Sequence, residues 1–148
     1  MILGLISDTH GLMRNEALQA LSGSDHIIHA GDVGSADVLN ALREIAPVTA
    51  IRGNVDTADW ARALPETVTI SLGGASIHVL HDVHDLKMSE GLDIVINGHS
   101  HNPSHVERGG VHYINPGSAG PRRFRLPVTV AWIDLSMTPR WVQFMPLV

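Results

Sequence analysis

The chain has 148 residues, of which 44% are hydrophobic and 17% are charged, and its formal net charge is −5 at pH 7. This composition predicts a single globular domain over residues 1–148 and excludes an intrinsically disordered chain. The acidic balance disfavours binding of nucleic acids or anionic membranes through a basic surface, and the absence of cysteine excludes disulfides and thiolate metal ligands.

The first third of the sequence alternates strands with helices. Three apolar runs predict buried strands over Ile2–Ser7, Asp25–Ala30 and Val48–Ile51. Apolar residues at helical spacing predict one helix over Asn15–Leu21 and a second that begins after Ser35, a suitable N-cap, and includes Ile45. This alternation predicts parallel strands joined by right-handed crossovers.

The rest of the chain predicts mainly antiparallel strands. Glycine pairs indicate two hairpins, formed by Thr67–Leu72 with Ala75–Leu80 and by Ser104–Glu107 with Val111–Ile114. Further strands are expected over Asp93–Ile96, Val128–Leu135 and Trp141–Met145. The predicted fold class is therefore α/β, with two mixed sheets packed on each other and helices on the outer faces.

Seven polar residues follow the carboxyl ends of five of these strands. They carry carboxylate, imidazole or carboxamide groups: Asp8, His10, Asp32, Asn54, His81, His99 and His101. These groups are hard and borderline donors that suit divalent cations such as Mn, Fe, Ni or Zn. Because ligands of open α/β sheets gather at the carboxyl ends of strands, we expect the seven side chains to form one metal site.

The spacing of the seven residues supports a site for two cations. Residues two apart on an extended chain point the same way, so Asp8 with His10, and His99 with His101, can each close on one cation. Seven ligands exceed one tetrahedral site but suit two cations about 3.5–4 Å apart, which bind the attacking and leaving oxygens of a phosphoryl displacement. The predicted reaction is in-line attack on phosphorus by a hydroxide that bridges the two metals, with no side-chain nucleophile.

Six motifs occur in a fixed order between residues 8 and 118. They are Asp8-Thr9-His10, Gly31-Asp32, Gly53-Asn54, His81, Gly98-His99-Ser100-His101 and Asn115-Pro116-Gly117-Ser118. As a set they resemble the calcineurin-like metallophosphoesterases, and most closely the small single-domain phosphodiesterase branch of that superfamily. The resemblance implies a four-layer α/β/β/α sandwich and hydrolysis of a small phosphoester substrate, with a phosphodiester favoured over a monoester.

The resemblance also implies a division of the ligands. The first metal is expected on Asp8, His10, Asp32 and His101, and the second on Asp32, Asn54, His81 and His99, with Asp32 bridging. Manganese is the expected metal, with iron, zinc or nickel as alternatives. Catalysis is then expected to act through the metals held by Asp32, Asn54 and His81, and Asn54 is also a candidate substrate ligand.

Two positions depart from the family pattern. Many phosphatases of the family place a histidine directly after the Gly-Asn pair, where it protonates the leaving group, but this chain has Val55 followed by Asp56. The branch often shows His-Gly-His at the position of His81, whereas here the second histidine is His84. Asp56 and His84 are therefore the candidates for proton transfer, and Asp56 is also a candidate loop cap. Loss of a general acid typically lowers a rate by about 10²–10⁴-fold.

Several alternatives remain open from the sequence. The cluster of Arg122, Arg123 and Arg125 is either a solvated loop or a clamp for substrate phosphate, which arginine binds bidentately. The alternative function is a non-catalytic metal-binding scaffold of the same fold that acts through protein contacts, as the retromer subunit of this family does. Edge strands near the C-terminus, with Trp141 and Phe144, make a homodimer a candidate assembly. No apolar run approaches the roughly 20 residues that span a bilayer, and a cytoplasmic location is expected.

Overall fold

The alternating first third of the chain forms the parallel part of one sheet. In the computed structural model, which describes residues 1–138 and 140–148, β1 (Ile2–Ile6), β2 (His26–His29) and β3 (Val48–Ala50) pair in parallel. Helices α1 (Asn15–Ala20) and α2 (Ala36–Arg43) are the crossovers. β9 (Thr129–Asp134) and β10 (Val142–Pro146) extend the sheet on the other side of β1 as antiparallel strands.

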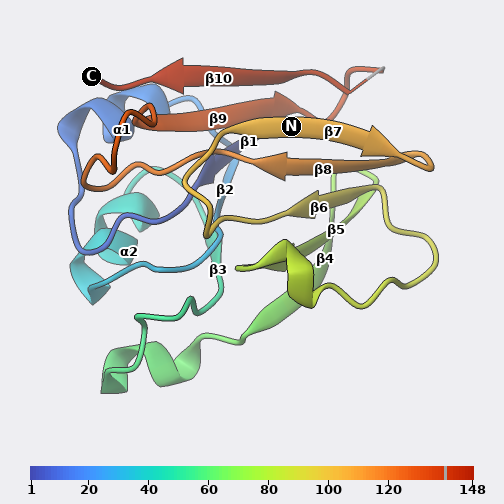
Figure 1. Ribbon diagram of the computed structural model, residues 1–148. Coiled ribbons are helices and arrows are strands. Elements are labelled where there is room, and N and C mark those ends of the chain that lie inside the picture. The colour runs from blue at the N-terminus through green and yellow to red at the C-terminus, as the bar shows by residue number, and fades with distance from the viewer. Residues whose placement is uncertain (139) are drawn as a thin grey trace.

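The middle of the chain forms the second sheet. Its strands are β4 (Thr67–Leu72), β5 (Ala75–Leu80), β6 (Ile94–Ile96), β7 (Ser104–Arg108) and β8 (Val111–Asn115). The two predicted hairpins are the antiparallel pairs β4–β5 and β7–β8, and β6 lies between them, parallel to both β5 and β8. Both sheets are therefore mixed, as predicted, and each has five strands (Figure 1).

The main core fills the space between the two sheets. Alternate residues of the central strands enter it, among them Leu3, Leu5, Ile77, Ile96 and Ile114, all fully buried. Burying one such side chain contributes about 1.5–3 kcal/mol. A second core lies under α1 and α2, which cover the outer face of the first sheet (Figure 1).

The outer face of the second sheet carries a thinner layer. Its cluster of Leu80, Leu92, Val95 and Val111 is covered by Leu86, which follows the short 3-10 helix η2 (Val83–Asp85). The other 3-10 helix, η1 (Asp59–Ala63), precedes β4. The α/β sandwich of two mixed sheets is confirmed, and the layer over the second sheet is a 3-10 turn with irregular chain instead of an α-helix.

Three local predictions need correction. α2 ends at Arg43, so Ile45 lies beyond the helix, and the Ser35 side chain makes no capping hydrogen bond although Ser35 occupies the N-cap. Phe144, which was named as support for a homodimer, packs against the main core instead of forming an exposed contact surface. Trp141, directly before the edge strand β10, is 46% exposed and lies next to Trp132. Within the described residues, no helix has the length and apolar character that crossing a membrane requires.

Candidate metal centre

The loops that follow β1 and β2 run side by side and hold the first ligands. The Asp8 N–H donates to the Gly31 carbonyl (3.0 Å), and the His10 N–H donates to the Asp32 carbonyl (2.9 Å). The Thr9 hydroxyl donates to the Val33 carbonyl (2.7 Å). Parallel pairing of the two strands is thus continued beyond their ends, which brings Asp8, His10 and Asp32 to the same edge of the sheet.

Left-handed backbone aims most of the predicted ligands. The φ angles of Asp8, His10, Asp32, His99 and His101 lie between 47° and 71°. This region costs a non-glycine residue on the order of 1–2 kcal/mol, and such strain gathers at functional sites. Asp8 and His10 do converge, with His10 Nε2 4.0 Å from Asp8 Oδ1, but the expected reason was wrong, because both residues are left-handed and not part of an extended chain. His99 and His101 are also left-handed, and they lie in different parts of the site.

Glycines allow the ligand loops to touch. A Cβ atom at Gly53 would collide with the amide and carboxylate of Asp32, and one at Gly98 would lie 2.8 Å from Asp8 Oδ2. A real Cβ atom needs more than 3.0 Å, so each site loop carries a glycine where a neighbouring ligand approaches.

One carboxylate oxygen lies at the centre of the site. Asp8 Oδ2 accepts hydrogen bonds from the Ser7 hydroxyl (2.8 Å) and the His99 N–H (3.1 Å). Asp8 Oδ1 is buried without a hydrogen-bond partner, and the Nε2 atoms of three imidazoles face it, from His101 at 3.4 Å, His81 at 3.7 Å and His10 at 4.0 Å. Burial raises the pKa of Asp8 against the opposing pull of His81. A buried anionic oxygen surrounded by ring nitrogens is the arrangement that a divalent cation satisfies.

Asp32 and His81 form the second close pair. Asp32 Oδ2 lies 3.1 Å from His81 Nε2 and 3.7 Å from His10 Nε2. Burial acts to lower the pKa of His81, but Asp32 and the Ala30 carbonyl raise it to about 9. Burial acts to raise the pKa of Asp32, but His81 and the Val55 N–H lower it to about 2. His81 Nδ1–H donates to the Ala30 carbonyl (2.8 Å), which leaves Nε2 as the ligand atom once it loses its proton.

The predicted ligands divide into a buried half and an exposed rim. The buried half contains Asp8, His10, Asp32, His81 and His101, and two overlapping groups within it could each hold a cation: Asp8 with His10 and His101, and Asp8 with Asp32 and His81. Asp8 is common to both groups, and Asp32 lies against members of both.

The exposed rim contains Asn54 and His99. Asn54 Nδ2 lies 3.5 Å from His99 Nδ1, and the His99 ring packs edge-on against His81, with ring centroids 5.2 Å apart. All seven predicted ligands therefore lie in one continuous cluster, although the rim makes fewer contacts than the buried half.

The two candidates for proton transfer have different surroundings. Asp56 is buried, and its carboxylate accepts hydrogen bonds from the N–H groups of Val33, Gly34 and Gly53, which agrees with a loop cap. The His84 side chain is 88% exposed and binds Asp82 through Nδ1 (2.9 Å). The other oxygen of Asp82 lies 3.8 Å from His99 Nε2, so His84 is linked to the rim through one carboxylate.

His29 has a role in the site that the sequence analysis did not predict. The Gly31 N–H donates to Nδ1 of His29 (3.2 Å). The Thr9 hydroxyl donates its hydrogen to the Val33 carbonyl, so it accepts from Nε2–H of His29 (3.0 Å). Burial lowers the pKa of His29 to about 3, so the ring is neutral and ties the two ligand loops together. The only signal in the sequence was the position of His29 at the end of an apolar run, two residues before Gly31-Asp32.

The Asn115-Pro116-Gly117-Ser118 motif positions loops and is not part of either group that could hold a cation. Asn115 Nδ2 donates to the Gly98 carbonyl (2.9 Å) and the Ser100 hydroxyl (3.1 Å). The Ser118 hydroxyl donates to the Asp8 carbonyl (3.0 Å). The motif therefore connects the loop of His99 and His101 to the loop of Asp8.

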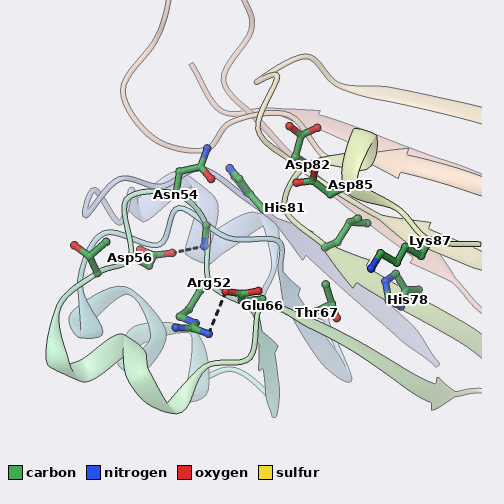
Figure 2. A pocket seen from close by; sticks show the side chains of 13 residues that line it. Arg52, Asn54, Asp56, Glu66, Thr67, His78, His81, Asp82, Asp85 and Lys87 are labelled. Carbon is green, nitrogen blue, oxygen red and sulfur yellow. Dashed lines mark hydrogen bonds and ion pairs between the residues drawn. The ribbon is translucent and has the colours of Figure 1, made fainter.

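A polar cavity of about 700 Å³ opens beside the cluster. Figure 2 shows Asn54 and His81 on one side and His78 and Lys87 on the other, with Arg52, paired to Glu66 (3.7 Å), below Asn54 and His81. This volume lies within the range of about 300–1,000 Å³ that small-molecule sites occupy.

The fold and a cluster of residues that could hold metal ions are shared with a known family, which comparison with known proteins identifies. Residues 1–138 match the model of the calcineurin-like phosphoesterase superfamily domain. The chain belongs to this superfamily, which confirms the resemblance seen in the motifs.

Several relatives resemble the chain over most of its length. A probable metallophosphoesterase of Methanocaldococcus jannaschii is 31% identical over 134 residues, which cover 80% of this chain and 68% of the relative. Phosphodiesterase YfcE of Escherichia coli is 27% identical over 164 residues, which cover 90% of this chain and 88% of YfcE.

Solved structures share the fold at lower identity. An archaeal phosphodiesterase superposes with a TM-score of 0.82 at 23% identity, over 98% of this chain and all of that one. Vps29 of Cryptosporidium parvum superposes with a TM-score of 0.77 at 19% identity, over 97% of this chain and 96% of Vps29. The same sandwich thus occurs in proteins described as enzymes and in a protein named for vacuolar sorting.

Proposed function

We propose that this protein is a dinuclear metal-dependent phosphoesterase that hydrolyses a phosphodiester by in-line attack of hydroxide on phosphorus. The observation that carries the proposal is the buried Asp8 Oδ1, which lacks a hydrogen-bond partner and faces three imidazole nitrogens. Without a metal, Asp8 Oδ1 keeps no hydrogen-bond partner, and a buried polar atom that is left unsatisfied is destabilising.

The donor atoms fit two divalent cations. Asp8, His10, Asp32 and His101 would hold the first, and Asp32, Asn54, His81 and His99 the second. The absence of cysteine and the mixture of oxygen and imidazole donors favour manganese, with iron, zinc or nickel as alternatives. When bound, such cations supply hydroxide near neutral pH and offset the charge on the phosphoryl oxygens.

The side chains around the cations would orient the substrate and move protons. Asn54 lies at the exposed rim, where an incoming phosphate first meets the site, so we assign it to substrate contact as well as to metal binding. Arg122 and Arg123 are the candidate clamp for phosphate oxygens.

His84 is the better placed of the two candidate proton donors. Its side chain is exposed and bonded to Asp82 beside the rim, whereas both carboxylate oxygens of Asp56 already accept backbone N–H groups. We therefore propose His84 as the acid that protonates the leaving group and Asp56 as the residue that holds the Gly53-Asn54 loop in place.

The preference for a diester has separate support. A diester carries an ester group on each side of phosphorus, and the cavity of about 700 Å³ next to Asn54 and His81 has room for one of them. The relatives include proteins named phosphodiesterase. We expect kcat/KM for bis(para-nitrophenyl) phosphate to exceed that for para-nitrophenyl phosphate, and the reverse order would contradict the preference.

The decisive experiment removes the carboxylate assigned as the bridge. The protein reconstituted with manganese should hydrolyse bis(para-nitrophenyl) phosphate, and Asp32→Ala should abolish turnover. Asp134→Ala, which removes a carboxylate at the opposite end of the sheet, is the matched control and should retain the wild-type rate. Equal rates for wild type and Asp32→Ala would sink the proposal. Repeating the assay with iron, zinc and nickel identifies the preferred metal.

The second candidate function is a non-catalytic metal-binding scaffold that acts through protein contacts. Two observations favour it: Val55 replaces the acid histidine of many family phosphatases, and Vps29 proteins share the fold. A scaffold predicts metal binding without turnover of any mono- or diester. Hydrolysis that depends on Asp32 excludes it.

A further inference from the structure

One loop beside the metal centre combines a rigid base with a fully exposed tip. Residues 119–127, here called the arginine loop, connect β8 to β9 (Figure 1). A bridge between Ser118 and Val128 closes the base, and the Ala119 N–H donates to the Ser7 carbonyl (3.0 Å). A Cβ atom at Gly120 would collide with the carbonyl of Asp8, so the loop leaves directly from the ligand loop.

The tip of the loop presents an aromatic ring to solvent. Phe124 is 93% exposed, and its φ angle is 54°. Among the described residues, the non-glycine residues with positive φ are five of the predicted metal ligands and Phe124. A hydrogen bond from the Leu126 N–H to the Arg123 carbonyl (3.1 Å) closes the turn that holds this conformation. Unfavourable backbone combined with an unpacked apolar ring points to a binding role, because neither stabilises the fold.

The charges around this ring are all positive. Arg122, Arg123 and Arg125 flank Phe124 in a chain whose net charge is −5. In the described part of the chain, the arginines that form ion pairs are Arg52 and Arg62, so the guanidinium groups of the loop are free for a ligand. Gly120, two residues before Arg122, lies against the backbone of Asp8 and Thr9, so the loop begins at the metal centre.

We propose that the arginine loop binds the nucleoside of a nucleotide phosphodiester, with the base stacked on Phe124 and phosphate oxygens bound by Arg122 and Arg123. Every base has a flat face that stacks on an aromatic ring, and guanidinium groups bind phosphate and also stack on bases. The inference rests on the proposed function and names its substrate class.

The same observations limit the size of the ligand. A long nucleic acid needs a basic stripe, and the acidic balance of this chain offers only one short basic segment. The loop starts beside the Asp8 loop, while the cavity of Figure 2 opens on the Asn54 and His81 side. A short diester can reach both features with its phosphate at the cations, so the loop takes one ester group and the cavity the other.

Two diesters of similar size test this assignment. Adenylyl-adenosine carries two bases on one phosphodiester, and bis-glycerol phosphodiester carries none. For Phe124→Ala we expect kcat/KM for adenylyl-adenosine to fall about tenfold, the typical loss when a base-stacking aromatic is truncated. The rate for the bis-glycerol diester should stay unchanged, and Phe124→Tyr should retain the wild-type ratio. Arg122→Ala tests the proposed contact with phosphate oxygens. Its control is Arg108→Ala, which removes an exposed arginine of β7.

A binding measurement separates failure of the loop from failure of the proposed function. In calorimetry with the metal-loaded protein, adenosine monophosphate should bind about tenfold more weakly to Phe124→Ala than to wild type, while glycerol phosphate binds both equally. Hydrolysis of neither diester would count against the proposed function, and calorimetry would still decide the role of the loop. An unchanged affinity for adenosine monophosphate in Phe124→Ala overturns the inference. The inference is also overturned if Phe124→Ala changes the protein from dimer to monomer in sedimentation while the affinities for both ligands stay unchanged. The loop would then be a subunit contact.

Discussion

The buried half and the exposed rim of the metal centre are built in different ways. In the buried half, Asp8 and His81 each have one polar atom fixed by a hydrogen bond and another left free toward the centre. In the rim, Asn54 and His99 contact each other at 3.5 Å and lie open to solvent. The protein thus organises one half before any cation binds and leaves the other adjustable, as a substrate entrance requires.

A proton donor added to the rim should give the largest change. Val55 follows Asn54, is half exposed, and contacts Asp32 through its backbone N–H, which a substitution preserves. In a His84→Ala background, which removes the proposed acid, Val55→His should raise the hydrolysis of a dialkyl phosphodiester by on the order of 10²–10³-fold, within the range of general acid catalysis. The activated aryl diester, whose leaving group needs no proton, should change little. An equal gain with Val55→Asn would show that protonation is not the cause.

Removal of one histidine from each half should affect metal affinity unequally. His81→Gln should weaken binding of one cation by about 100-fold, because His81 is oriented by Ala30 and faces two carboxylates. His99→Gln should weaken it by only about tenfold, since the rim is less constrained. Calorimetric titration of manganese into both variants measures the difference. Equal losses would remove the distinction between the two halves.

A smaller effect should follow from the partner of a ligand. The Ser7 hydroxyl fixes Asp8 Oδ2, so Ser7→Ala should lower manganese affinity by about tenfold without removing a ligand. Ser136→Ala breaks a similar hydrogen bond, to Asp134 (2.7 Å), at a turn far from the site and is the control. If both variants bind manganese as wild type does, orientation of Asp8 contributes nothing measurable.

Hydrophobic periodicity and motif order were enough to predict much of this molecule. Apolar runs ending in Asp8, Asp32 or His81 placed the strands, because buried strands need such runs and their loops meet at one edge. The backbone of the ligands could not be read in this way. Left-handed φ angles at Asp8 and His99 depend on hydrogen bonds to loops distant in sequence. The role of His29 was hidden for the same reason, since its two partners belong to different loops.

The pH dependence of stability tests that hidden histidine, with the smallest expected effect. The folded-state pKa of His29, about 3, lies below its unfolded value, so its contribution to stability is complete above pH 6.5 and is lost as pH falls toward 3. From pH 6 to pH 5 the free energy of unfolding of the metal-free protein should drop by about 1 kcal/mol through His29. His81 adds almost nothing to the change in the free energy of unfolding between pH 6 and pH 5. Its pKa of about 9 keeps it protonated in the folded state, and its side chain is also mostly protonated in the unfolded state at these pH values. Denaturant titrations of wild type and His29→Gln at both pH values should therefore differ in slope, whereas the exposed His84→Gln should match wild type. Parallel curves for wild type and His29→Gln would mean that His29 is not held neutral, and that the two ligand loops are joined without it.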